Sequence, residues 1–216
     1  MIGNPINYDK KFKDKFPIFP AKFDPALKRY LHLIPGKEVL DLGIGQGTNS
    51  IPLAELGFNV TGVDYSIKCL EICKNSCNKL NLVHSDIRSF KIEKNKYDLI
   101  KSRCILHFLH KNDIYDIIKN IKNNLKSDGL VYISVFSLED PSFNFKCNNP
   151  DFDTLENNVF HKISDDTYSS YFSKDEILKL FSDFDTIFIS DEYSLDLGHG
   201  TPHYHGIIKY IGKKIK

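Results

Sequence analysis

Residues 39–49, which read Val-Leu-Asp-Leu-Gly-Ile-Gly-Gln-Gly-Thr-Asn, decide the fold. A short apolar run leads into a Gly-x-Gly-x-Gly turn, and a segment of helical periodicity follows at 48–56. Glycine has no Cβ, so its backbone can approach a ligand closely where a strand ends. Open α/β sheets bind their ligands at the carboxyl ends of the strands. The stretch therefore predicts a ligand-binding turn at the edge of such a sheet.

On either side of this turn, short β-branched runs alternate with helical segments, which is typical of a mostly parallel sheet with helices on both faces. A capping box formed by Ser173 and Glu176 predicts a further helix near the end of the chain. The last two strands have no crossover helix between them, so we expect an antiparallel hairpin at the sheet edge. The predicted fold class is α/β, with a Rossmann-like sheet of seven strands. We expect strands at 38–42, 59–63, 81–84, 97–101, 130–135, 186–190 and 204–211, and helices at 48–56, 66–79, 112–125 and 174–181.

Two segments lie outside this alternation. Residues 1–37 form an entry or cap segment, in which Lys alternates with Phe over 8–23. That pattern can bind single-stranded nucleic acid, but an amphipathic segment that packs on the domain is the favoured interpretation. Residues 138–172 are rich in Asn, Asp and aromatic side chains, and we expect an ordered loop there that acts as a substrate lid. Residues 38–216 are expected to form one domain.

Composition narrows the class of protein. The 216 residues are 41% hydrophobic and carry 29 Lys and Arg against 28 Asp and Glu, which excludes intrinsic disorder. The net charge of +1 makes a nucleic-acid partner unlikely. Five cysteines without a CxxC spacing predict free thiols. No apolar run approaches the ~18–20 residues that span a bilayer, so we expect a cytoplasmic protein without membrane association. Nothing in the sequence predicts an oligomeric state.

Two carboxylates indicate which ligand the turn binds. Asp64 ends the second expected strand, where it can accept both ribose hydroxyls of an adenosine. Asp41 directly precedes the glycine turn, and its charge would oppose a pyrophosphate by about 1 kcal/mol or more. The last glycine of a dinucleotide fingerprint is replaced by Thr48. A cationic cofactor without phosphates, S-adenosylmethionine, therefore fits better than the NAD of a dehydrogenase.

These residues resemble those of the class I S-adenosylmethionine-dependent methyltransferases. The family's Asp/Glu-x-Gly-x-Gly-x-Gly motif matches 41–47, and its ribose-binding acid matches Asp64. The resemblance also implies that Asp86 and Ile87 flank the adenine and that Tyr8 closes over the cofactor. The residues expected to bind S-adenosylmethionine, or its product S-adenosylhomocysteine, are Tyr8, Asp41, Gly43, Gly45, Gly47, Asn49, Asp64, Tyr65, Ser66, Asp86, Ile87 and Arg103.

Within this class, the chain is most similar to the tellurite-resistance methyltransferases. The similarity rests on the run 40–50, on the Asn-Tyr pair at 7–8 and on the late His199. The chain departs from that family at Ile44, where some members have Cys, and at Gly200, where the family has Arg after the histidine. These two departures affect which methyl acceptor is expected, and they do not change the expected cofactor.

Three histidines near the end of the chain are the candidate catalytic residues: His199, His203 and His205. In an extended segment His203 and His205 point to the same face. They could orient an anionic acceptor, act as a general base or supply two metal ligands. No third ligand follows from the spacing, so no metal site is predicted. Capping of the sheet edge is the alternative structural role.

The predicted function is methyl transfer from S-adenosylmethionine to a small molecule. Methyl transfer is an in-line displacement, so a soft nucleophile (S, Se, Te or As) needs only positioning, whereas an amine or oxygen nucleophile needs a base. The alternatives are a methyltransferase of RNA or protein and a non-catalytic cofactor-binding module. The Asx-Pro-Pro-aromatic stretch of enzymes that methylate base amines is replaced by Lys-Ser-Arg-Cys at 101–104. Cys69, Cys73 and Cys77 share one helix face, and we interpret them as core residues.

Overall fold

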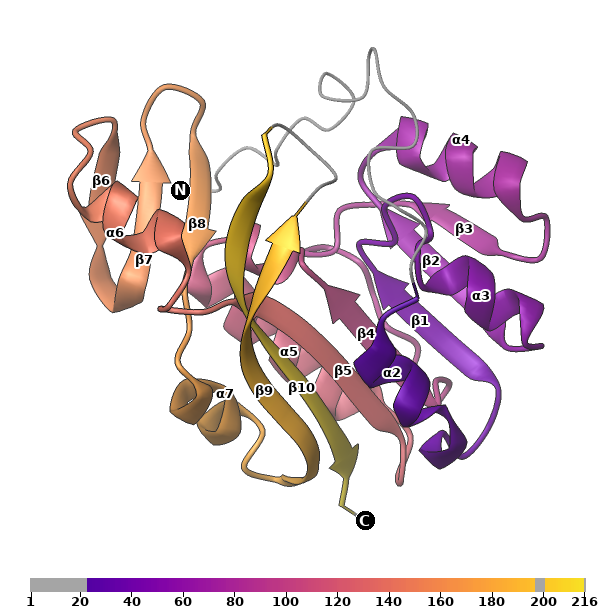
Figure 1. Ribbon diagram of the computed structural model, residues 1–216. Helices are drawn as coiled ribbons and strands as arrows, with labels where there is room; N and C mark the ends of the chain where they lie inside the picture. The colour runs from indigo at the N-terminus through magenta and orange to yellow at the C-terminus, as the bar shows by residue number, and fades with distance from the viewer. Residues whose placement is uncertain (1–22, 197–200, 216) are drawn as a thin grey trace.

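The computed structural model describes residues 23–196 and 201–215 (Figure 1). Within these ranges the main sheet has seven strands in the order β3-β2-β1-β4-β5-β10-β9. The first five strands are parallel, and β10 runs antiparallel to both β5 and β9. The predicted fold class and the antiparallel hairpin are confirmed. The strands are β1 (Glu38–Leu42), β2 (Asn59–Asp64), β3 (Asn81–His84), β4 (Leu99–Arg103), β5 (Leu130–Phe136), β9 (Phe184–Asp196) and β10 (His203–Lys214).

Helices cover both faces of this sheet, with α2 in front and α5 behind in Figure 1. Successive residues of a strand point to opposite faces, and β5 shows the consequence. Val131 and Ile133 pack in one cluster with residues of α5 and α7, whereas Leu130 and Tyr132 pack in another with α2 and α3. Every residue of β5 is buried. The helices are α2 (Pro25–Arg29), α3 (Ser50–Glu55), α4 (Ile67–Ser76), α5 (Lys111–Asn124), α6 (Pro141–Cys147) and α7 (Lys174–Leu180), with short 3-10 turns η1 (Leu31–Leu33), η2 (Leu106–Phe108) and η3 (Glu156–Asn158).

Several predicted boundaries are displaced by one to three residues. The helix expected at 48–56 begins at Ser50, because the glycine turn continues through residue 49. The strand expected at 97–101 is β4, two residues later. The helix expected to begin at 112 begins at Lys111, and the His110 side chain caps it by accepting a hydrogen bond from the Asn112 amide at 3.2 Å. The Ser173 cap is confirmed, since its hydroxyl accepts from the Glu176 amide at 3.1 Å.

The prediction of a loop over 138–172 is wrong about its secondary structure. The segment forms α6 and a three-stranded antiparallel sheet of β6 (Phe152–Leu155), β7 (Val159–Lys162) and β8 (Thr167–Ser170). Figure 1 shows this sheet standing beside the main sheet, next to the hairpin of β9 and β10. Phe160 and Tyr171 of the small sheet region pack against Phe136 and Ile207 of the main sheet. The scattered aromatic residues therefore form a second core, and strands too short to show a period explain why the sequence pattern suggested a loop.

The described part of the entry segment, from residue 23 onward, packs on the domain, whereas the stretch over 8–23 to which the amphipathic interpretation applies lies almost entirely outside the described residues. Asp24 caps α2 by accepting from the Ala26 amide at 2.9 Å, and Leu27 joins the cluster on that face of the sheet. Residues 1–22 lie outside the described residues. Among the residues that are described, no helix combines the length and apolar character needed to cross a membrane.

Candidate active site

The glycine turn is open toward one side. Gly43, Gly45 and Gly47 all have positive φ, a conformation that glycine adopts without steric cost. At Gly45, with φ +54°, an added Cβ would meet nothing within 4 Å. The turn is held to β2 by the amides of Gly43 and Ile44, which both donate to the Val63 carbonyl at 2.8 and 3.0 Å. The backbone at Gly45 thus faces free space that a ligand can occupy.

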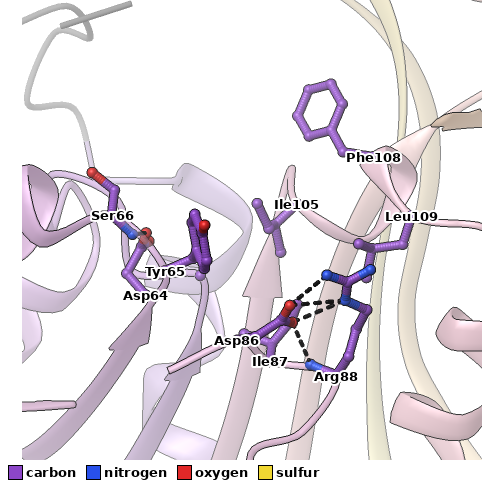
Figure 2. Close-up of a pocket in the computed structure, with 10 residues that line it drawn as sticks. Asp64, Tyr65, Ser66, Asp86, Ile87, Arg88, Ile105, Phe108 and Leu109 are labelled. Atoms are coloured by element: carbon purple, nitrogen blue, oxygen red, sulfur yellow. Dashed lines mark hydrogen bonds and ion pairs between the residues drawn. The ribbon is translucent and has the colours of Figure 1, made fainter. Parts of the chain in front are cut away.

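A pocket lies at the carboxyl ends of β1 to β4, the edge that the sequence predicted (Figure 2). Its polar side comes from the ends of β2 and β3, and its apolar side comes from the segment that follows β4. Six of the residues that line it were predicted to bind the cofactor: Gly43, Asp64, Tyr65, Ser66, Asp86 and Ile87. Four were not: Arg88, Ile105, Phe108 and Leu109. The three apolar ones could have been found, because they follow the fourth expected strand and the ends of parallel strands share one edge.

Asp64 is one of the two aspartates that line this pocket. Its carboxylate accepts hydrogen bonds from the amides of Gly45 at 2.8 Å and Ser66 at 2.9 Å. Burial raises the pKa of Asp64, while these backbone hydrogen bonds oppose the shift. An ionised carboxylate has about four lone-pair sites, so two amide donors leave capacity for the hydroxyls of a ligand.

Asp86 forms an ion pair with Arg88 inside the pocket, drawn as dashed lines in Figure 2. Arg88 Nε donates to both carboxylate oxygens, at 3.1 and 2.9 Å, and the Arg88 amide donates at 2.9 Å. Burial raises the pKa of Asp86, but the hydrogen bonds from Arg88 outweigh it and lower the pKa overall. Asp86 is therefore charged but compensated, and the chain itself provides the counter-ion.

Asp41 lies behind the turn rather than in the pocket. Its side chain is 2% exposed, pairs with Lys101 Nζ and accepts from Ser50 Oγ at 2.6 Å. Burial lowers the pKa of Lys101, and the neighbouring Asp41 carboxylate opposes that shift. The argument that Asp41 presents uncompensated charge to a pyrophosphate is therefore wrong. Asp41 and Lys101 lie opposite one another on the neighbouring strands β1 and β4. Because they are 60 residues apart in the sequence, the sequence pattern could not predict this register.

Asn49 and Arg103 also point away from the pocket. Asn49 Oδ1 accepts from the Asp24 amide at 2.8 Å, and Arg103 Nε lies 3.6 Å from an Asp24 carboxylate oxygen. Both residues thus hold the entry segment and are absent from the pocket lining. The predicted cofactor residue Tyr8 lies outside the described residues.

Two of the three candidate catalytic histidines come together at the start of β10. The Nε2 atoms of His203 and His205 are 3.0 Å apart. His205 Nδ1 lies 2.9 Å from Asp140 Oδ2, and His203 Nδ1 lies 2.8 Å from the Thr201 carbonyl oxygen. The predicted third member, His199, lies outside the described residues. Asp140 was not predicted, because it reaches His205 through the packing of α6 on β10.

The histidine pair and the pocket are joined by aromatic rings. The His205 ring stacks on Phe136 with centroids 5.0 Å apart, and Phe136 meets the edge of Phe108 at 5.8 Å. Phe108 in turn lines the pocket. His107 is buried on Phe136, with ring centroids at 3.5 Å, and its Nδ1 accepts from the Phe136 amide. Burial lowers the pKa of His107, so this ring is a neutral packing residue.

Comparisons with known proteins agree with this arrangement. Residues 39–129 match the family described as a methyltransferase domain. The chain is 35% identical over 108 residues to a probable S-adenosyl-L-methionine-dependent methyltransferase, TehB, of Haemophilus influenzae, covering 48% of this chain and 37% of that protein. It is 34% identical over 111 residues to a ubiquinone biosynthesis O-methyltransferase of Glaesserella parasuis, covering 47% and 46%. The match thus spans less than half the length of either curated relative.

Solved structures extend the likeness beyond the matched region. The crystal structure of TehB from Haemophilus influenzae superposes with a TM-score of 0.70 at 21% identity, covering 96% of this chain and 66% of that one. A Burkholderia thailandensis 1,6-didemethyltoxoflavin N1-methyltransferase, solved with its substrate and S-adenosylhomocysteine, gives 0.62 at 18% identity, covering 97% and 84%. At these identities the structures establish the fold. The predicted resemblance to the class I methyltransferases, with TehB among the similar proteins, is confirmed.

Proposed function

We propose that the protein transfers a methyl group from S-adenosylmethionine to a small molecule. One observation carries the proposal. The glycine turn, the Asp64 carboxylate and several apolar side chains meet at a single pocket at the carboxyl edge of the sheet. The match of residues 39–129 to a methyltransferase domain supports it.

The residues that line the pocket fit this cofactor. Asp64 would accept the ribose hydroxyls, and the backbone at Gly45 leaves room for the rest of the molecule. Ile87, Ile105 and Leu109 provide an apolar enclosure for an adenine ring. Asp41 and Asp86 are paired with Lys101 and Arg88, so Asp64 is the aspartate of the described pocket lining that could balance a cationic ligand. When bound, the cofactor supplies an electrophilic methyl group on a sulfonium.

The chain has to position an acceptor in line with that methyl group and exclude water. Phe108 lines the pocket and contacts Phe136, and the ring of His205 stacks on Phe136, so aromatic contacts connect the pocket to the histidine pair. We infer that this pair acts on the acceptor and that Asp140 orients His205. The folded segment of α6 and β6 to β8 stands beside the same edge, and we propose that it contributes the acceptor-binding lid.

Titration calorimetry of the 216-residue chain with S-adenosylhomocysteine and with NAD tests the cofactor. We expect binding of S-adenosylhomocysteine, and Asp64→Asn should weaken it about 10- to 100-fold because charge-assisted hydrogen bonds are lost. Asp165→Asn is the matched control, since this exposed carboxylate belongs to a remote turn and pairs with Lys162. Equal binding of NAD, or equal effects of the two substitutions, would overturn the assignment.

A screen with a methyl-labelled donor tests the acceptor class. Thiols, selenite, tellurite, arsenite, amines, hydroxyl compounds, RNA and protein serve as acceptors in parallel. Labelled small-molecule product is the expected result. Label found only in RNA or protein would replace the small-molecule proposal, and binding without transfer to any class would make the protein a cofactor-binding module.

A further inference from the structure

A cluster of metal-binding side chains lies on one face of the hairpin of β9 and β10. His203 and His205 are two residues apart on β10 and so share a face, and Asp196 on β9 is paired directly with His203. One ligand atom from each of the three residues lies within 4.8 Å of the others. The third ligand that spacing along the chain could not provide is thus supplied by strand pairing.

Hydrogen bonds at Nδ1 set the tautomers of the His203 and His205 imidazole rings. The Thr201 carbonyl oxygen only accepts, so His203 Nδ1 must donate to it. The Asp140 carboxylate acts as an acceptor, taking hydrogen bonds from the amides of Ser142 at 2.8 Å and Gly206 at 3.0 Å, so His205 Nδ1 donates as well. In a neutral imidazole whose Nδ1 carries the hydrogen, Nε2 presents a lone pair.

The two Nε2 lone pairs therefore point at one another across 3.0 Å. Such an approach is repulsive unless a proton or a metal cation lies between the two nitrogens. Two imidazole nitrogens bound tetrahedrally to one Zn²⁺ at about 2.0–2.1 Å are about 3.3–3.4 Å apart, so the observed 3.0 Å would have to widen by only a few tenths of an ångström. Asp196 Oδ2, 3.9 Å from His205 Nε2, supplies a carboxylate on the same side.

We propose that His203 Nε2, His205 Nε2 and the Asp196 carboxylate bind a divalent transition-metal ion of the zinc type. Two imidazoles and one carboxylate are a ligand set that suits such ions, and three protein ligands leave a position open for a small molecule. Asp140 is the positioning residue, because ligating histidines usually donate their second N–H to a carboxylate or a carbonyl. His203 has the carbonyl of Thr201 in that place.

The role of the ion rests on the proposed function. The site is connected to the pocket, since His205 stacks on Phe136 and Phe136 contacts Phe108 of the pocket lining. An acceptor hydroxyl or thiol bound to the ion would lose its proton to solvent. The lone pair of the resulting oxygen or sulfur anion would form the bond to the methyl carbon, while the donor C–S bond breaks and its electron pair stays on sulfur. The acceptor class is then a hydroxyl or thiol compound that coordinates a metal.

Zn²⁺ alone, titrated calorimetrically into the chelator-treated full chain, tests the site without any activity. We expect one ion per chain, loss of that binding in His203→Ala, His205→Ala and Asp196→Asn, and a weakening of about 10- to 100-fold in Asp140→Asn. His161→Ala is the matched control, because His161 also pairs with an aspartate, Asp166, at 2.8 Å but belongs to the small sheet. Circular dichroism checks that each variant is folded.

Co²⁺ in place of Zn²⁺ distinguishes this site from the free cysteines. A spectrum without a thiolate-to-metal charge-transfer band is expected. Failure of the wild-type chain to bind Zn²⁺, or binding that survives the double substitution His203→Ala/His205→Ala, would overturn the site. S-adenosylhomocysteine binding should be unchanged in these variants. If Zn²⁺ binds through the pair but S-adenosylhomocysteine does not bind, the proposed function fails while the metal site stands.

Discussion

At the scale of single residues, the site depends on how charges are compensated. Three aspartates lie at or near the carboxyl ends of β1, β2 and β3, but each has a different environment. Asp41 is buried with Lys101, Asp86 pairs with Arg88, and Asp64 accepts hydrogen bonds from the backbone amides of Gly45 and Ser66. A carboxylate that is not neutralised by a cationic side chain is available to a cationic ligand. Asp64 is therefore the residue on which cofactor binding should depend most.

Removing one partner of the Asp41–Lys101 pair should destabilise the protein much more than removing both partners. Lys101→Met leaves a buried carboxylate uncompensated, and we expect a loss of about 3–5 kcal/mol in the free energy of unfolding. Asp41→Asn/Lys101→Met removes both charges and should recover most of that loss. Urea denaturation measures both variants.

Lys96→Met is the control for this comparison. Lys96 pairs with Glu93 at the surface, where an ion pair contributes about 0–1 kcal/mol. A Lys101→Met variant as stable as Lys96→Met would contradict the presence of an ionised Asp41–Lys101 pair in the folded protein.

At the scale of elements, α6 is fixed to β10 by a close backbone contact. An added Cβ at Gly206 would lie 2.5 Å from the Asp140 amide nitrogen, so only glycine permits the approach. The Gly206 amide donates to Asp140 Oδ2, the oxygen that also faces His205 Nδ1. The contact between two elements thereby sets the geometry of the histidine pair.

Gly206→Ala should force α6 away from β10. We expect a loss of about 1–3 kcal/mol in the free energy of unfolding, as for other overpacked sites, together with weaker Zn²⁺ binding because His205 loses its partner. Ser194→Ala, at the exposed position paired with His205, should stay within about 0.5 kcal/mol of the parent. Unfolding curves and Zn²⁺ titration of both variants provide the measurement, and unchanged Zn²⁺ binding in Gly206→Ala would contradict the coupling.

At the scale of the whole molecule, the small sheet and the main sheet share one aromatic core. Phe136 and Ile207 of the main sheet contact Phe160 and Tyr171, and the Tyr171 hydroxyl accepts from Lys146 Nζ at 2.8 Å. Burial lowers the pKa of Lys146 to about 8. A lysine at the junction of the two parts therefore makes their association dependent on pH.

The sign of that dependence follows from proton binding. Between about pH 8 and 10.5 the unfolded chain holds the Lys146 proton and the folded chain has lost it, so the free energy of unfolding rises with pH across this window. The contribution should reach about 1–3 kcal/mol after allowance for partial exposure.

Lys146→Met removes this group and should remove the rise. The difference in stability between Lys146→Met and the parent, measured by urea denaturation at about pH 7 and at about pH 9.5, should change in favour of the parent as the pH increases. Because other titrating groups are common to both proteins, they cancel in the difference. A difference independent of pH would contradict the lowered pKa.

Contiguous residues were sufficient to predict the alternating sheet, the glycine turn and Asp64 as an acid that lines the pocket. These features follow from backbone conformation, hydrophobic period and the end of one strand, all of which are local. Contacts between distant segments were not predictable: Lys101 beside Asp41, Asp140 beside His205 and Asp196 beside His203. Each depends on strand register or on how a helix packs, and many segments of similar character could have filled those places. The cofactor pocket could therefore be predicted from the sequence. Tertiary packing decided which residues neutralise Asp41, orient His205 and add a third ligand beside His203.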